Sequence, residues 1–338
     1  METLSELFNT RFGTSPDVME PMAGAGSNRK YYRLNGGGLS AVGVCGTSAE
    51  ENRAFIYLSR HFRKHKLPMP EIFAVSADAM RYLQEDFGGH SLYDALAPAR
   101  ARGYEYDAAD AALIEHTLRG LAHVQVEGAR DIDESSLLSP RRMDTRAAMF
   151  DLNYFKYMFL RAQDIPLDEI LLEDDMLRLA SDLCGKPCQT FLYRDFQARN
   201  VMLSPEGVPR FIDFQGGRLG PLQYDVASFL WQASAHYPEA LRERLLAAYL
   251  DELAMLTEVN REEFTQRLQG FVLLRTLQVL GAYGLRGIVE RKTYFLQSIP
   301  PALDNLRKLL RQRVCRPYPY LEKTLHRLCD ADTNYGKP

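Results

Sequence analysis

Three polar residues, Asp195, Asn200 and Asp213, stand next to short apolar runs in the second half of the 338-residue sequence. Asp195 and Asn200 lie in one polar segment between the runs 191–193 and 201–203, and Asp213 ends the next apolar run. A loop between short strands can direct such short side chains into one pocket. Carboxylate and amide oxygens are ligands that suit Mg²⁺. Phosphoryl transfer needs these ligands and a carboxylate beside the attacking hydroxyl, so we expect Asp195 to be catalytic and Asn200 and Asp213 to bind Mg²⁺.

The elements that position these residues divide the sequence into a β-rich part and a helical part. Apolar periodicity and turn signals predict strands at 31–34, 39–45, 71–75 and 81–83, a hairpin turn at 35–38, and helices at 4–12 and 50–65. From Ser91 onward helical periodicity dominates, with helices expected at 108–123, 146–162, 174–184, 238–257, 261–284 and 299–310. We therefore predict an α+β, bilobal fold with a β-rich N-terminal lobe (1–86) and a mostly helical C-terminal lobe (87–338).

The segment from Tyr193 to Asn200 resembles the kinase catalytic loop H-R-D-x-x-x-x-N, with Tyr193 in place of the histidine. The residues Asp213-Phe214-Gln215 stand where kinases carry D-F-G. Together with Gly220-Pro221 and the stretch 224–228 (YDVAS), these motifs make the sequence similar to the aminoglycoside phosphotransferase/choline kinase superfamily. The resemblance implies a protein-kinase-like fold, ATP as phosphoryl donor and Mg²⁺ as cofactor.

The same resemblance implies a nucleotide site in the N-terminal part. A turn rich in small residues is similar to the phosphate-covering loop, whose backbone N–H groups approach phosphate oxygens. The backbone of the linker around Gln84 and Asp86 would pair with adenine. An ordinary hairpin turn is the alternative for the first segment, because the third glycine of G-x-G-x-x-G is absent. The residues expected in the turn are Gly24, Gly26, Ser27, Asn28 and Arg29.

The third strand departs from the kinase pattern. Kinases place a lysine there, paired with a helix glutamate, to hold the nucleotide phosphates. The matching strand, 40–45 (SAVGVC), has no lysine, so Glu50 or Glu51 lacks its expected partner. Because the phosphates still need positive charge, we expect Arg29, and secondarily Arg33, to supply it.

The acceptor is expected to be a small molecule, a sugar or amino sugar. The stretches 278–281, 291–294 and 298–300 resemble the C-terminal region of bacterial cell-wall sugar kinases that act on N-acetylmuramate and N-acetylglucosamine. Arg275 and Gln278 share one helical face and offer hydrogen bonds to a sugar; the alternative is that they only face solvent on that helix. Arg199 is expected to contact phosphate or substrate, with a solvated side chain as the alternative. The anomeric hydroxyl is one of the expected acceptor groups, whereas the sequence does not indicate the exact hydroxyl or the oligomeric state.

Three other interpretations remain. A catalytically inactive binding protein with a kinase fold would explain the missing lysine. It would not explain why Asp195, Asn200 and Asp213 are all present. A protein kinase is disfavoured because eleven residues between Asp213 and Asp225 leave little room for an activation segment, and no A-P-E follows. Aminoglycoside and choline-type kinases stay open as alternatives.

The overall composition limits the classes of partner that the protein is expected to bind. The formal net charge of −3 gives no global basic field that would recruit nucleic acid. No uninterrupted apolar run approaches the ~20 residues that span a bilayer, and residues 1–10 lack the features of a signal peptide. Five scattered cysteines do not form a disulfide framework. These features predict a cytoplasmic protein with no membrane or nucleic-acid partner.

Overall fold

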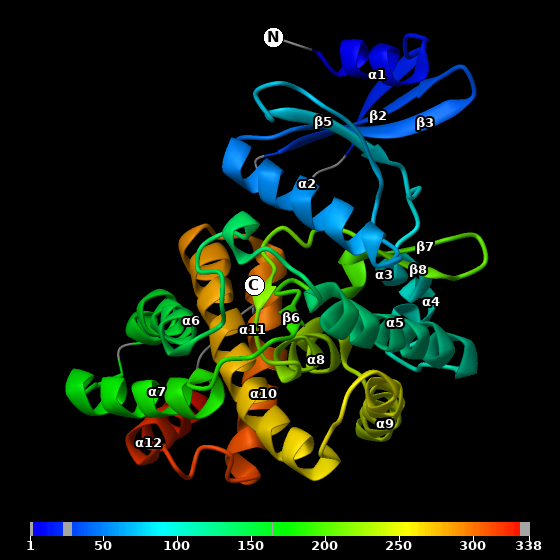
Figure 1. Cartoon of the computed structure of the whole chain (residues 1–338). Helices are drawn as coiled ribbons and strands as arrows, with labels where there is room; N and C mark the ends of the chain where they lie inside the picture. The colour runs from blue at the N-terminus through cyan, green and yellow to red at the C-terminus, as the bar shows by residue number, and fades with distance from the viewer. Residues whose placement is uncertain (1–2, 23–28, 164, 332–338) are drawn as a thin grey trace. The chain divides into compact units, whose positions relative to one another are not determined.

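The computed structural model describes residues 3–22, 29–163 and 165–331. It has an N-terminal five-stranded antiparallel sheet followed by a mostly helical region (Figure 1). The predicted α+β fold class is therefore confirmed.

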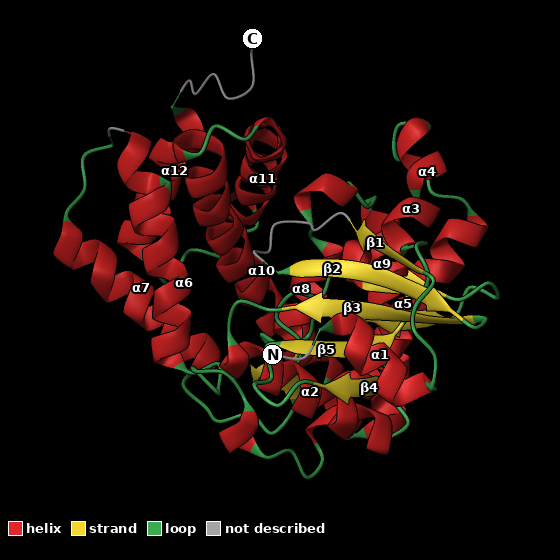
Figure 2. Cartoon of the chain, turned by 90° about the horizontal axis from the view of Figure 1, so that it is seen from above, coloured by secondary structure: helices red, strands yellow, loops and turns green. Residues whose placement is uncertain are grey.

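The sheet has the strand order β1-β2-β3-β5-β4 (Figure 2). Two glycines with positive φ, Gly37 at 58° and Gly38 at 77°, make the turn between β2 and β3, which confirms the predicted hairpin. β1 was not predicted, because its sequence VMEPM is almost wholly exposed and lacks apolar alternation. The strands are β1 (Val18–Met22), β2 (Lys30–Gly36), β3 (Leu39–Cys45), β4 (Ile72–Val75) and β5 (Arg81–Glu85).

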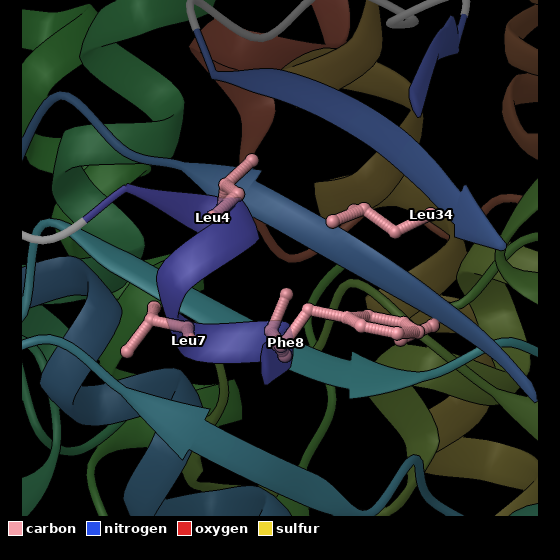
Figure 3. Packing of buried hydrophobic residues seen from close by; sticks show 6 residues of the cluster. Leu4, Leu7, Phe8 and Leu34 are labelled. Atoms are coloured by element: carbon pink, nitrogen blue, oxygen red, sulfur yellow. The ribbon is translucent and has the colours of Figure 1, made fainter. Parts of the chain in front are cut away.

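The helix α1 (Leu4–Phe12) covers one face of this sheet. The side chain of Thr3 caps its first turn, and Leu4, Leu7 and Phe8 pack with Leu34 of β2 (Figure 3). A Cβ added at Gly43 of β3 would lie 2.7 Å from Leu34 and 2.9 Å from Leu4. The glycine therefore lets the helix and strand side chains reach the sheet surface, and the opposite face stays available for a ligand.

The chain separates into two compact units, Met1–Arg141 with Tyr193–Arg218, and Arg142–Leu192 with Leu219–Pro338. The first unit takes in residues 87–141 and the catalytic-loop segment besides the sheet, and the lobe boundary expected at residue 86 stays a prediction. Besides the sheet and α1, the first unit contains α2 (Ala49–Lys64), α3 (Leu92–Ala95), α4 (Ala97–Ala101), α5 (Ala108–Val126), η1 (Glu127–Ala129), η2 (Glu134–Ser136), η4 (Ala198–Asn200), β7 (Val201–Leu203) and β8 (Pro209–Phe211).

The second unit is built around the long helix α10, which packs on α6, α8 and α11. A Cβ at Gly281 would lie 2.8 Å from the backbone nitrogen of Phe155, so this glycine permits the close approach of α10 to α6. The elements of this unit are α6 (Thr145–Met158), η3 (Leu160–Gln163), α7 (Glu169–Cys184), β6 (Phe191–Leu192), α8 (Gln223–Leu230), η5 (Ala233–Ala235), α9 (Glu239–Leu256), α10 (Arg261–Tyr283), the π-helical turn η6 (Gly284–Val289), α11 (Thr293–Arg311) and α12 (Pro319–Asp330); β9 (Arg218–Leu219) lies at the boundary.

One helical stretch of the described residues, Arg261–Val289, is long and apolar enough to cross a membrane by length and composition alone. The core helix of a folded domain meets the same criterion, and half of the apolar window is buried inside the protein. The sequence prediction concerned apolar runs without a charged residue. Arg275 interrupts the stretch Arg261–Val289, so this stretch is not such a run.

Candidate active site

A short hairpin holds Asn200 beside the segment that carries Asp213. β7 pairs with β8 from Val201 opposite Phe211, and the amide of Ile212 donates to the carbonyl of Asn200 at 3.0 Å. The hydroxyl of Tyr193 donates to the carbonyl of Ile212. These bonds join both ends of the catalytic segment, so the side chains of Asn200 and Asp213 are brought together as predicted.

Two amides contact the carboxylate of Asp213. Nδ2 of Asn200 donates to Oδ2 at 3.2 Å, and Nε2 of Gln215 donates to Oδ1 at 2.8 Å. Within 3–22, 29–163 and 165–331 no cluster of three or more His, Cys, Asp or Glu side chains is placed to hold a metal. The oxygen donors here are instead one carboxylate and neighbouring amides, a set that fits Mg²⁺ because this hard ion accepts few protein oxygens and retains waters.

Asp195 lies next to this set. Its side chain is exposed, and its carbonyl oxygen accepts a second hydrogen bond from Nδ2 of Asn200 at 2.9 Å. The preceding Arg194 has φ of 81° and Asp213 has φ of 67°. Such left-handed conformations cost on the order of 1–3 kcal/mol each for residues other than glycine, so the surrounding bonds must hold them in place. The strain indicates a stiff loop that aims the two carboxylates.

Aromatic stacking connects this loop to the helix α2. The ring of Phe214 stacks on Phe55 with centroids 4.7 Å apart and meets Phe62 edge-on at 5.5 Å. Phe55 in turn stacks on Tyr82 of β5 at 5.4 Å. The residue after Asp213 is therefore a hydrophobic anchor, and it ties the position of the carboxylate to the helix and the sheet.

A cavity of about 370 Å³ lies in the first unit, on the sheet face opposite α1. This volume is typical of a small-molecule site. Of the predicted site residues it brings together Arg29, Gln84, Asp86, Arg199, Asn200 and Asp213. Asp195 is not part of its lining, and the other lining residues are Met22, Tyr31, Val42, Phe55, Tyr82, Glu85, Phe87, Gly88, Gly89, Ser91, Tyr93, Asp94, Met202, Ile212 and Gln215.

Arg29 lines the cavity and pairs with a glutamate of α2. Its buried guanidinium forms an ion pair with Glu51 of α2 at 2.7 Å, with 3% of the Arg29 side chain exposed. Of the two candidate helix glutamates, Glu50 and Glu51, it is thus Glu51 that pairs with an arginine. Arg33 instead binds Asp86 and does not line the cavity.

Asp86 uses its carboxylate to fix the linker. Arg33 donates to it at 2.7 and 3.0 Å, the Ser40 hydroxyl at 2.7 Å and the Gly88 amide at 2.9 Å. Burial alone would raise the pKa of Asp86, but the hydrogen bonds from Arg33 and Ser40 outweigh it, so the pKa lies below its ordinary value. The Asp86 side chain is therefore a structural anion that holds the linker in place.

Arg199 stacks on an aromatic ring at the cavity edge. Its guanidinium carbon lies 3.6 Å from the ring centroid of Tyr93, and that of Arg100 lies 3.7 Å from the same centroid. At such short distances the two cations occupy opposite ring faces. The sequence analysis did not identify Tyr93 or Gln215 as site residues. The signal for Gln215 was its place directly after Asp213-Phe214, whereas nothing in the local sequence marks Tyr93.

The predicted substrate residues Arg275 and Gln278 belong to the second unit. Arg275 donates to the Tyr224 hydroxyl at 3.1 Å, to the Ser228 hydroxyl at 2.8 Å and to Oε1 of Gln278. Tyr224 donates onward to Asp151 at 3.3 Å. The two residues thus share one face of α10, as expected, within an internal polar network. The predicted phosphate-covering residues Gly24, Gly26, Ser27 and Asn28 lie outside the described residues.

Comparison with known proteins gives a consistent set of relatives. Residues 18–259 match the model of the family described as "Phosphotransferase enzyme family" (APH). A curated relative from Pseudomonas aeruginosa, named N-acetylmuramate/N-acetylglucosamine kinase, is 25% identical over 296 residues, which are 84% of this chain and 81% of the relative.

Two solved structures share the fold. The choline kinase from Cryptosporidium parvum Iowa II has a TM-score of 0.61 and 12% identity, with 90% of this chain and 93% of that chain covered. A thermostable mutant of aminoglycoside phosphotransferase APH(4)-Ia, in ternary complex with AMP-PNP and hygromycin B, has a TM-score of 0.56 and 14% identity, with coverage of 98% and 100%. The resemblance drawn from the motifs is confirmed.

Proposed function

Because the chain belongs to the phosphotransferase enzyme family, we propose that it is a kinase that transfers the γ-phosphate of ATP to a hydroxyl of a sugar or amino sugar. The anomeric hydroxyl is one of the hydroxyl groups that we propose as the acceptor. The observation that carries the proposal is the joining of Asn200, Asp213 and Arg29 in one cavity of about 370 Å³.

The cavity offers each charge that a nucleoside triphosphate requires. Arg29, paired with Glu51, provides a positive charge for the phosphates. Asn200 and Asp213 would hold Mg²⁺, which neutralises charge on the β- and γ-phosphates when it is bound. The main chain of Asp86 and Phe87, two residues that line the cavity, would contact the adenine end.

The position of Asp195 supports a catalytic role for this residue rather than a role in binding. Its carboxylate is exposed beside the metal-ligand set, where it can accept the proton of an acceptor hydroxyl. Positioned proton transfer of this kind contributes typically ~10²–10⁴-fold in rate. A chain that only binds nucleotides would not require a strained loop that fixes this carboxylate.

The acceptor class rests on the curated relative, which is named for N-acetylmuramate and N-acetylglucosamine. Choline and aminoglycosides are the competing acceptors, because the two structural neighbours are named for them. Arg275 and Gln278 are proposed sugar contacts; their mutual hydrogen bond supports a preformed polar surface.

A side-by-side transfer assay tests the proposal. The full chain with ATP and Mg²⁺ is offered N-acetylmuramate, N-acetylglucosamine, glucose, galactose, choline and kanamycin, and phosphorylated product is quantified. Turnover of an amino sugar with kcat/KM well above that of choline and kanamycin is expected. Turnover of choline or kanamycin alone would rule out a sugar as the acceptor, while the proposed kinase activity would stand. No product and no ATP binding would discard both.

A further inference from the structure

We propose that the side-chain amide of Gln84 selects adenine over guanine in the cavity, so that the protein uses ATP in preference to GTP. This inference rests on the kinase function proposed above and deepens it. The sequence expectation concerned only the backbone of the linker at this residue, and the side chain is a separate contact.

The sheet turns the Gln84 side chain toward the cavity. Successive residues of a strand face opposite sides. Tyr82 and Gln84 of β5 both line the cavity, whereas Leu83 between them is packed in the cluster under α1. Gln84 stands opposite Val42 of β3 on one side and Ile72 of β4 on the other. Since β5 lies between two strands, the side chain is the part of Gln84 that reaches a ligand.

The amide of Gln84 has an unmet hydrogen-bonding group. The residue is 8% exposed, and its Oε1 is buried without a hydrogen-bond partner among the described residues. Nearly all buried polar atoms in proteins have a partner, and an exception calls for an explanation. A ligand that donates a hydrogen bond into the cavity provides one.

The two purines present different groups to such an amide. Adenine carries the N6 amino donor next to the N7 acceptor, and a glutamine side chain can bond both at once. Guanine presents O6 and N7, two acceptors, on the same edge. With guanine bound, Oε1 of Gln84 would stay without a donor and would face a carbonyl oxygen. We therefore expect binding of ATP to exceed that of GTP on the order of 10- to 100-fold, the discrimination typical of one bidentate contact.

The other edge of the base, on its N1 side, would contact the main chain of the linker. The Asp86 side chain is held by Arg33 and Ser40, which fixes the direction of the adjoining backbone. The main-chain groups at Asp86 and Phe87 can then contact the N1 side of the base while Gln84 contacts the N7 side. Two contacts on separate edges require the base to bind in one orientation.

Nucleotide binding by titration calorimetry tests the inference. The full chain with Mg²⁺ is titrated with ATP, GTP and 7-deaza-ATP, which lacks the N7 acceptor. The unmodified protein should bind ATP more tightly than both others. In the near-isosteric variant Gln84→Met, ATP affinity should fall on the order of 10- to 100-fold and become equal to that of 7-deaza-ATP, because the linker contacts on the N1 side are the same for these two nucleotides. The control Met202→Leu, which changes an apolar part of the same cavity, should alter all three affinities by one common factor.

The possible failures are distinguishable. If the unmodified protein binds no nucleotide, the kinase function itself fails. If it binds ATP and GTP equally, or ATP and 7-deaza-ATP equally, the kinase function stands and the role of Gln84 is overturned. The same holds if Gln84→Met keeps the original preference for ATP over 7-deaza-ATP. The titration of the unmodified protein with 7-deaza-ATP decides the matter even when the variant does not fold.

Discussion

Asp195 contributes to the site through two different atoms. Its carbonyl oxygen accepts a hydrogen bond from Asn200 and so belongs to the scaffold of the loop, whereas its carboxylate is exposed. A substitution that changes only the carboxylate therefore leaves this main-chain hydrogen bond in place.

We expect Asp195→Asn to lower kcat by roughly 10²–10⁴-fold while the dissociation constant for ATP stays nearly unchanged. The amide keeps the shape of the side chain but cannot accept the proton. Steady-state kinetics and calorimetry measure the two quantities. Asp330→Asn, at an exposed aspartate near the end of α12, is the matched control. An unaltered kcat in Asp195→Asn would falsify the catalytic assignment.

Arg29 has the environment of a phosphate-binding cation. We expect Arg29→Ala to raise the KM for ATP by about tenfold or more, because a hydrogen bond to a charged group contributes about 1.5–3 kcal/mol. Arg29→Lys should recover part of the loss. Arg53→Ala, at an exposed arginine of α2, should leave KM unchanged. An ATP dependence that is the same in Arg29→Ala and the unmodified protein would place the compensating charge elsewhere.

The pairing of Asp86 predicts a pH-dependent stability. Its folded pKa is lowered, so the stabilisation is full above the unfolded value of about 3.9 and is lost as pH falls through the lower folded pKa. Asp86→Asn should reduce the free energy of unfolding by about 1.5–3 kcal/mol at pH 7, with the difference shrinking below about pH 4.

Urea unfolding at a series of pH values measures this difference. Asp251→Asn is the control, because Asp251 pairs with Arg261 at 2.6 Å on an exposed surface, where an ion pair contributes about 0–1 kcal/mol. A difference for Asp86→Asn that persists unchanged at pH 2 to 3 would contradict the assigned role of the charge.

At the scale of elements, the C-terminal helix α12 depends on a residue of α7. Its own N-cap residue, Tyr318, provides no side-chain cap. Instead the carboxylate of Asp175, which is 4% exposed, accepts from the backbone amides of Tyr320 at 2.6 Å and Leu321 at 3.0 Å. A negative charge at a helix N-terminus also interacts favourably with the helix dipole.

Asp175→Ala should therefore lower the free energy of unfolding by about 1–2 kcal/mol, the upper range for loss of a helix cap. Chemical denaturation followed by circular dichroism measures it. The neighbour Asp174 is exposed, so Asp174→Ala should change stability by less than about 0.5 kcal/mol. Equal effects of the two substitutions would mean that the cap contributes nothing.

These elements also show what local sequence predicts. The strand at 39–45 and the helix at 261–284 have strong periodicity or turn signals, and both were found. The helix α12 was missed, although Leu321, Leu325 and Leu328 stand at helical spacing and Pro319 lies in its first turn. The exposed strand β1 was not predicted either, because it is defined by pairing with β2, which the local sequence does not show. The same limit applies to the site. Spacing predicted that Asn200 and Asp213 meet, whereas the pair Arg29–Glu51 depends on how α2 packs against the sheet.

At the scale of the whole molecule, nucleotide binding should stabilise the fold. A ligand that binds only the folded state at 100 times its dissociation constant adds about 2.7 kcal/mol. We therefore expect ATP with Mg²⁺ to raise the Tm by several degrees, and addition of a chelator to remove most of the increase. Thermal unfolding followed by fluorescence measures it. In Asp213→Asn the increase should no longer depend on Mg²⁺; a metal-dependent increase there would point to other ligands.

All residues that line the cavity come from the first of the two compact units, the sheet and the catalytic-loop segment together. Among the described residues the proposed nucleotide site uses no side chain of α10 or α11, so we expect it to bind nucleotide before any acceptor arrives. In bisubstrate kinetics this arrangement favours a sequential mechanism in which the nucleotide binds to the free enzyme. Double-reciprocal plots should then intersect, and the dissociation constant of the nucleotide measured without a sugar should be close to the constant obtained from those plots.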